Sequence, residues 1–155
     1  MKRLVEAIVR MLEDRGETIS FMESCTGGYL ASHITNVSGS SNVLKVSLVT
    51  YSNEYKVKFG VDKVMMEEAG VYSNFTSNEM ALKVSEFAKS NWGVGITGQL
   101  GIEPSMVYYT IYRDEGNNVE FFDYCILAEG KTREEKKEYI ANRLFMNLLE
   151  HIVGE

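Results

Sequence analysis

The chain has 155 residues, 45% of them hydrophobic, a size and composition that suit one globular domain with a buried core. Its formal net charge of −6 argues against sequence-independent binding to DNA or RNA, which requires a surplus of basic residues. Its longest apolar runs are far shorter than the roughly 20 residues of a membrane-spanning helix, and the amphipathic N-terminus is unlike a signal peptide. We therefore expect a cytoplasmic protein whose partners include neither nucleic acid nor a membrane.

The few cysteines and histidines limit the redox and metal chemistry that the chain can carry. Cys25 and Cys125 have neither the number nor the spacing of a disulfide framework or a zinc site. His33 and His151 lie outside any cluster with metal-ligand spacing. We expect reduced thiols, no metal and no other cofactor.

Hydrophobic periodicity and turn residues predict helices that alternate with strands in the first half of the chain. Apolar residues between Leu4 and Leu12 recur with the helical period, and Gly16 has the position of a C-terminal cap. In chain order we expect this helix, a strand over 18–23, a helix to about residue 37, a flexible connector over 38–42, a strand over 44–51, a loop with a helical turn over 52–60, and a short helix over 62–69.

The second half is predicted to hold two longer helices, a buried strand and a hairpin. Thr76 or Ser77 would cap the first of these helices, because Glu79 follows Thr76 at the spacing of a capping box. The buried stripe of this helix would consist of Met80, Val84, Phe87 and Ala88. Turn residues at 114–118 predict a hairpin. The strands are expected at 93–97, 106–112 and 119–127, and the last helix at 132–153.

This order of elements predicts a three-layer α/β/α sandwich around a mixed, mostly parallel sheet of about five strands. We find neither an internal repeat nor a linker, so we expect a single domain over residues 1–155 rather than an accessory piece of a larger protein. The predicted hairpin is crowded with aromatic residues, more than both of its faces would bury in one small core. They favour a homodimer or a higher homo-oligomer and are Tyr108, Tyr109, Tyr112, Phe121 and Phe122.

Polar residues lie at the ends of three predicted strands, where ligands bind in open α/β sheets. They are Ser24-Cys25-Thr26, Tyr51-Ser52 with Lys56 close by, and Thr97-Gly98. These groups predict one shared site.

Ser24 lies at a bend between a predicted strand and a predicted helix, a common way to present a nucleophile. At about 100° per residue, His33 lies on roughly the opposite face of that helix from Ser24. His151 lies in the last turn of the final helix, where a favourable interaction with the helix dipole is enough to explain its presence. A Ser-His-Asp triad is therefore not expected. Lys56 is the best-placed base, since burial can lower the pKa of a lysine.

Cys25 is the rival nucleophile, because a helix N-terminus would lower the pKa of its thiol. The alternative is that Cys25 has no chemical role and packs as a small buried hydrophobic residue. Gly27 and Gly28 would open the helix so that free backbone N–H groups admit an anion. Tyr51 would relay a proton or bind a ligand; the alternative is an aromatic residue that ends a strand.

Five segments together resemble the C-terminal domain of the CinA family, and the resemblance covers nearly the whole chain. They are ESCTGG (23–28), YSNEYKVKFGV (51–61), AGVYSNFTSNEMA (69–81), GITG (95–98) and GKTREEKK (130–137).

The resemblance implies a nicotinamide-nucleotide amidohydrolase, which converts nicotinamide mononucleotide and water to nicotinate mononucleotide and ammonia. It also implies a three-layer sandwich and homo-oligomers. Ser24 would be the nucleophile, Lys56 its base or proton shuttle, and Tyr51 and Thr97 assisting groups. Arg133 would meet the substrate phosphate. The other substrate contacts would come from Cys25, Thr26, Gly27, Gly28, Gly98 and Lys137, with oxyanion donors at 25–28 or at Gly98.

The sequence departs from the family pattern beside the predicted site. The loop after Thr97 is several residues shorter and has no lysine, and Lys137 stands where a second arginine is expected. A lysine lacks the planar fork with which arginine binds phosphate. The alternative function is therefore a catalytically altered or inactive family member that binds a nucleotide-like metabolite.

Overall fold

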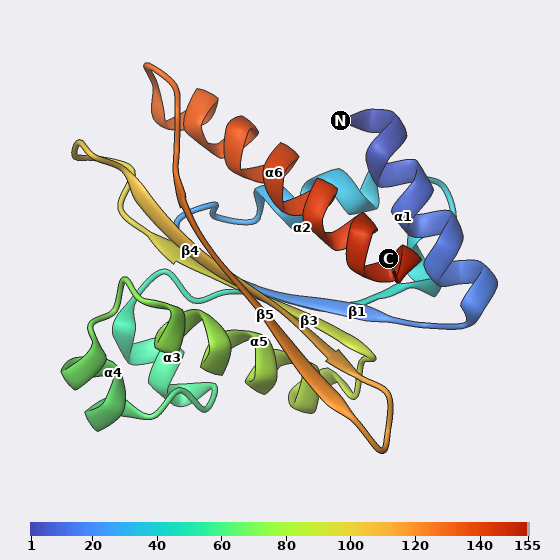
Figure 1. The fold of residues 1–155 in the computed structure, drawn as a ribbon, viewed down its shortest axis with the longest axis horizontal. Coiled ribbons are helices and arrows are strands. Elements are labelled where there is room, and N and C mark those ends of the chain that lie inside the picture. Colours follow the sequence, from blue (N-terminus) through green and yellow to red (C-terminus); the bar gives the residue numbers. More distant parts are fainter. Residues whose placement is uncertain (155) are drawn as a thin grey trace.

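A computed structural model describes residues 1–154, and its centre is a five-stranded sheet (Figure 1). The strands are β1 (Ile19–Glu23), β2 (Leu44–Val49), β3 (Trp92–Gly98), β4 (Met106–Asp114) and β5 (Val119–Leu127), in the spatial order β2-β1-β3-β4-β5. β1 pairs in parallel with β2 and β3, whereas β4 is antiparallel to both of its neighbours. Because β4 alone runs the opposite way, the sheet is mixed and mostly parallel, as predicted.

Helices cover both faces of the sheet, which confirms the three-layer architecture (Figure 1). One face carries α1 (Lys2–Arg15), α2 (Tyr29–Thr35) and α6 (Arg133–Val153); the other carries α3 (Asn53–Lys58), α4 (Lys63–Ala69) and α5 (Asn74–Ala88). A short 3-10 helix, Ser40–Asn42, lies within the predicted connector. α1 ends at Gly16 in the left-handed conformation, as its cap position predicted. Within residues 1–154, no helix is long and apolar enough to cross a membrane.

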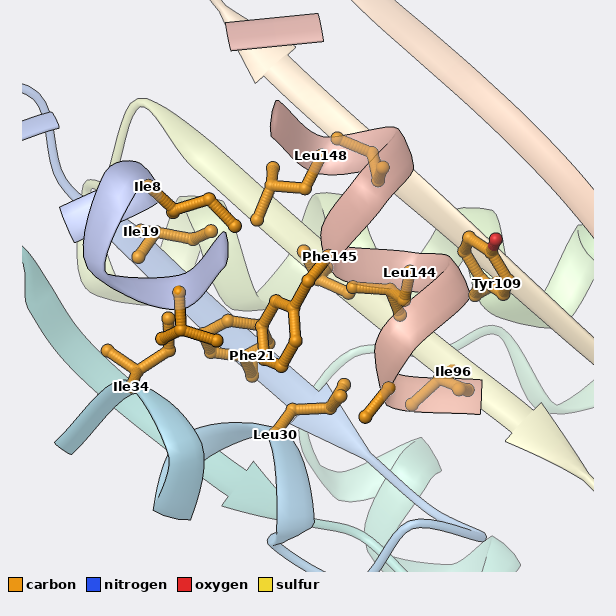
Figure 2. Close-up of a cluster of buried hydrophobic side chains, with 14 of the residues drawn as sticks. Ile8, Ile19, Phe21, Leu30, Ile34, Ile96, Tyr109, Leu144, Phe145 and Leu148 are labelled. Carbon is orange, nitrogen blue, oxygen red and sulfur yellow. The ribbon is translucent and has the colours of Figure 1, made fainter. Parts of the chain in front are cut away.

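The larger hydrophobic core lies between the sheet and the layer of α1, α2 and α6. Figure 2 shows Phe21 of β1, Leu30 of α2 and Phe145 of α6 converging there, and all three are fully buried. Burial of each such side chain stabilises the fold by roughly 1.5–3 kcal/mol. This core holds α1, α2 and α6 together on one face of the sheet.

The opposite face of β3 carries glycines because α5 lies directly on it. A Cβ atom at Gly93 would stand 2.2 Å from the Ala81 carbonyl oxygen, and one at Gly95 would stand 2.3 Å from the Ser77 carbonyl oxygen. Any side chain at either position would push the helix off the sheet. The glycines of the predicted strand therefore set the spacing between layers.

α5 begins earlier than predicted. Ser73 is its N-cap, with Oγ accepting a hydrogen bond from the Thr76 backbone N–H at 3.3 Å, so the prediction of a cap at Thr76 or Ser77 is wrong. Thr76 and Ser77 are buried inside the helix instead, where Ser77 Oγ bonds to Thr110 Oγ1 of β4 at 2.7 Å. Three small hydroxyl residues lie near the start of this helix, and the burial of Thr76 and Ser77 against the sheet leaves Ser73 as the cap.

The predicted buried stripe of α5 is confirmed at Met80 and Val84 and wrong at Phe87. Phe87 is 60% exposed and packs edge-on against Phe59, with ring centroids 5.7 Å apart. Ala88 is only partly buried. The buried face of α5 includes Ala81 and Ser85 instead, which lie against Gly93 of β3.

The aromatic residues of the hairpin are less exposed than the sequence suggested, because α5 and α6 cover its two faces. Tyr109 and Tyr112 are buried, and Tyr109 donates a hydrogen bond to Asn147 Oδ1 of α6 at 2.6 Å. Tyr108 and Phe122 are partly buried, and Phe121 is 40% exposed. The crowding argument is therefore wrong for the two buried tyrosines, and a homo-oligomer stays a prediction.

Candidate active site

Ser24 and Lys56 form a buried pair at the carboxyl end of the parallel strands. Ser24 follows β1 and is held by its backbone N–H, which donates to the Ile96 carbonyl oxygen of β3 at 3.1 Å. Lys56 Nζ lies 3.0 Å from Ser24 Oγ and donates to the Thr50 carbonyl oxygen at 2.8 Å. Lys56 is 1% exposed. The two side chains meet because β2, which leads into α3, lies beside β1 in the sheet.

Burial changes the acid–base chemistry of Lys56. Removal of water around the ammonium lowers the pKa of Lys56 from 10.5 to about 8, while the nearby Cys25 opposes the change. At pH 7, roughly one Lys56 side chain in ten is then a neutral amine. Only the neutral amine has a lone pair that can accept the Ser24 proton, so the pair has the chemistry of a nucleophile and its base.

Cys25 is a poor nucleophile in this environment. Its side chain packs into the larger core and is 3% exposed, and burial raises the pKa of the Cys25 thiol to about 12. The prediction that a helix N-terminus would favour a thiolate is therefore wrong: α2 begins only at Tyr29, and the loss of solvation outweighs the nearby lysines that lower the pKa of Cys25. The structure agrees with the alternative, a small buried hydrophobic residue, and favours Ser24 over Cys25.

The buried carboxylate of Glu23 organises the turn after β1. Its Oε1 accepts hydrogen bonds from Thr26 Oγ1 at 2.6 Å and from the Leu30 backbone N–H at 3.0 Å. Its Oε2 accepts from the Ala31 backbone N–H at 3.1 Å. Glu23 therefore occupies the N–H groups of the first turn of α2, and the prediction that they would receive a ligand anion is wrong at these two positions.

The remaining donors of the turn lie closer to the serine. Within residues 1–154, the backbone N–H groups of Cys25 and Thr26 donate no hydrogen bond to another residue. The Gly27 N–H donates to the Ser24 carbonyl oxygen at 3.0 Å, which closes the turn. Gly27 and Gly28 have φ angles of +59° and +96°, in the left-handed region where a side chain would be strained. The glycines of ESCTGG thus shape the turn.

A cavity of about 310 Å³ opens over the Ser24–Lys56 pair. Tyr51 and Arg133 stand at its exposed rim, where Arg133 Nη2 donates to the Tyr51 hydroxyl oxygen at 3.1 Å. Tyr51 is 63% exposed, so its hydroxyl belongs to the rim and not to the buried pair. Of the predicted site residues, the cavity brings together Ser24, Cys25, Tyr51, Lys56, Gly98 and Arg133.

The other predicted site residues do not line this cavity. The Thr26 hydroxyl is turned to Glu23, and the Thr97 hydroxyl donates to the Val71 carbonyl oxygen at 3.3 Å. Thr97 therefore supports a wall residue and has no direct place beside Ser24. Gly27, Gly28 and Lys137 also lie outside the lining, with Lys137 packed beside Gly27. The substrate contacts expected from these residues are not supported by the geometry.

Several lining residues were missed in the sequence. Asn53 comes from the start of α3 and Tyr72 from the segment before α5, while Gln99 begins the loop after β3. Asn53 and Tyr72 lie in segments that resemble the family, and Gln99 lies in the loop after Thr97, but none of the three had a predicted role. Tertiary structure places them at the cavity. Glu23 was missed as well, because it is the last residue of β1 and precedes the N-cap of α2, Gly28, by too many residues to give a capping signal.

Across residues 1–154, no group of three or more histidine, cysteine, aspartate or glutamate side chains is placed to hold a metal ion. The cavity instead offers a hydroxyl, an amine, a guanidinium and side-chain amides. This set of groups suits acyl transfer on an anionic substrate.

The chain matches the family model of the CinA C-terminal domain over residues 1–107. A CinA-like protein from Rippkaea orientalis is 34% identical over 138 residues, which cover 84% of this chain and 33% of that protein. A putative competence-damage inducible protein from Caldanaerobacter subterraneus subsp. tengcongensis is 44% identical over 101 residues, or 64% of this chain and 24% of that protein. The chain thus spans a third or less of the length of these relatives.

Solved structures of the same family share the fold. A competence-damaged protein (CinA) superfamily protein from Klebsiella pneumoniae superposes with a TM-score of 0.90 at 20% identity, covering 99% of this chain and 98% of that one. A competence or damage-inducible protein from Enterobacter asburiae gives 0.89 at 24% identity, covering 97% of each chain. The match to the family model covers Ser24 and Lys56 and stops before α6. The chain belongs to the CinA family and carries its C-terminal domain.

Proposed function

We propose that this chain is an amidohydrolase that acts on the carboxamide of nicotinamide mononucleotide. The observation that carries the proposal is the buried Lys56 amine, 3.0 Å from Ser24 Oγ and with its pKa lowered to about 8. Such a pair can activate a serine without a histidine.

In this mechanism, Ser24 Oγ attacks the amide carbon while the neutral Lys56 amine takes the hydroxyl proton. The backbone N–H group of Cys25, the lining residue next to Ser24, is the donor available for the oxyanion. The tetrahedral intermediate collapses as Lys56 returns the proton to the leaving nitrogen, which departs as ammonia. Water then attacks the Ser24 ester, with Lys56 again as base, and releases the carboxylate product.

The rim of the cavity supports an anionic substrate. Arg133 stands at the opening and the reactive pair lies at the buried end, so a substrate with an amide at one end and a phosphate at the other fits this polarity. The family resemblance names nicotinamide mononucleotide as a molecule of that kind. Tyr51 and Tyr72 are exposed aromatic residues of the lining and are available to contact its ring.

Ammonia release from nicotinamide mononucleotide tests the proposal. Wild type should turn the substrate over, Ser24→Ala should lose at least a hundredfold in kcat, and Cys25→Ala should stay within about threefold of wild type. Full activity in Ser24→Ala would remove the serine from the mechanism. Loss of activity only in Cys25→Ala would transfer the role to the thiol.

The alternative proposal is a family member that binds a nucleotide-like metabolite without hydrolysing it. Its support is that Lys137, the second cation expected for the phosphate, lies outside the cavity lining. Calorimetry on folded wild type would then show binding of nicotinamide mononucleotide with no ammonia released.

A further inference from the structure

The segment Gln99 to Ser105, here called the 99–105 loop, joins β3 to β4 and forms one wall of the cavity. Leu100 is 3% exposed and packs into the larger core, whereas Ile102 is 56% exposed. Leu100 is the one buried apolar side chain of the loop, Ser105 is its one buried polar residue, and the other loop residues are exposed. The position of the loop must come from further contacts.

Lys136 of α6 supplies these contacts. It is 5% exposed, although a lysine is among the residue types that are rarely buried. Its Nζ donates to the Leu100 carbonyl oxygen at 3.2 Å, to Ser105 Oγ at 2.7 Å and to Glu103 Oε1 at 2.5 Å. One ammonium thus uses its three N–H donors on the start, the middle and the end of the loop.

The loop carries a second layer of hydrogen bonds that depends on the first. Ser105 Oγ, which accepts from Lys136, donates to the Ile102 carbonyl oxygen at 2.7 Å. The Glu103 carboxylate is exposed, so its ion pair with Lys136 is screened by water and adds little. The buried carbonyl and hydroxyl would be left without a donor if the ammonium were removed, and such groups are costly to leave unpaired.

The position of the loop also sets the place of Arg133. A Cβ atom at Gly101 would stand 2.9 Å from Arg133 Nη1, so the guanidinium lies against the loop backbone. Its other terminal nitrogen reaches the Tyr51 hydroxyl across the opening of the cavity. Arg133 and Lys136 are one turn apart on α6, and together they hold the loop at the rim and at its base.

We propose that Lys136 is a positioning residue that fixes the 99–105 loop so that Arg133 stands at the cavity opening to bind the anionic group of the substrate. The part of this inference that concerns substrate rests on the proposed function. Lys136 has no contact with Ser24 and does not line the cavity, so its effect is on binding and not on the chemical step.

Lys136→Met tests the inference, because methionine keeps the length of the side chain and removes the ammonium. We expect the KM for nicotinamide mononucleotide to rise roughly tenfold with kcat within about twofold, as for a loss of binding. The KM for nicotinamide riboside, which has no phosphate, should not change. Amide hydrogen exchange in peptides covering 99–105 should become at least about tenfold faster. Lys131→Met, at an exposed lysine before the same helix, is the matched control and should behave as wild type.

Ser105→Ala is the milder variant if Lys136→Met does not fold, and it should show the same changes at smaller size. Unchanged exchange in the loop, or a fall in kcat without a rise in KM, would overturn the inference. An equal rise in KM for the mononucleotide and the riboside would also overturn it.

If wild type binds nicotinamide mononucleotide without turnover, the proposed function fails, and the dissociation constant from calorimetry replaces KM in the same comparison. If wild type shows neither binding nor turnover, the proposed function and the substrate part of the inference both fail.

Discussion

Replacing Lys56 with methionine should abolish function without weakening the fold. The fall in the pKa of Lys56 from 10.5 to about 8 means that the buried ammonium opposes folding by about 3 kcal/mol at pH 7. Methionine removes that charge and fills a similar space, but leaves the Thr50 carbonyl oxygen without its donor, at a cost of about 1–3 kcal/mol. The net expectation is a variant as stable as wild type, or more stable by up to about 2 kcal/mol.

The pH dependence of this difference has a definite sign. Between pH 8 and 10.5 the unfolded chain holds a proton on Lys56 that the folded chain has lost, so the free energy of unfolding of wild type rises with pH. Lys56→Met has no such gain. The stability advantage of the variant should therefore shrink by about 2 kcal/mol between pH 7 and 9.5.

Urea unfolding at several pH values measures both quantities, and ammonia release measures activity. We expect kcat to fall by about 10²–10⁴, the usual contribution of a general base. Lys58→Met, at an exposed lysine of the same helix, is the control and should change neither quantity appreciably. A stability difference that is constant from pH 7 to 9.5 would refute the reasoning about the buried amine. So would a Lys56→Met variant less stable than wild type by more than about 2 kcal/mol at pH 7.

Three further predictions follow from burial and close packing. At pH 7 the neutral thiol of Cys25 should react with iodoacetamide far more slowly than the exposed Cys125, as measured by peptide mass; equal rates would contradict the raised pKa of Cys25. Gly95→Ala should lower the free energy of unfolding by at least about 2 kcal/mol because its Cβ would meet the Ser77 carbonyl oxygen, and a wild-type urea midpoint would contradict that contact. Burial lowers the pKa of His151, so the stability that its neutral ring contributes is present above pH 6.5 and lost as the pH falls below it. His151→Phe should reduce this loss between pH 7.5 and 5, and an unchanged loss would exclude the histidine as its cause.

The order of elements could be predicted because each has a local signal. Gly16 ends the first helix, the turn at 114–118 joins the hairpin strands, and alternation of helices with strands favours a sheet covered on both faces. The pairing of Ser24 with Lys56 could be anticipated because the ends of neighbouring parallel strands lie at one edge of the sheet. Periodicity and topology carry these predictions.

Predictions that depended on burial were less successful. The pKa of Cys25 rises because its side chain enters the core, which its position before a helix does not reveal. The roles of Glu23 and Lys136 depend on the burial of their charged groups, and sequence patterns treat such residues as exposed. Thr97 lies at the end of β3 as predicted, but the alternation of side chains along the strand turns its hydroxyl toward Val71. Local signals locate the site, and tertiary contacts decide which side chains line it.

The pH profile of kcat/KM for nicotinamide mononucleotide tests most directly the claim that a neutral Lys56 amine activates Ser24. The account predicts that kcat/KM rises about tenfold per pH unit between pH 6 and 7 and levels off near pH 8, the pKa of Lys56 in the free protein. A profile that is flat from pH 6 to 9 would contradict the claim. So would a profile that levels off near pH 6.5, where a histidine titrates.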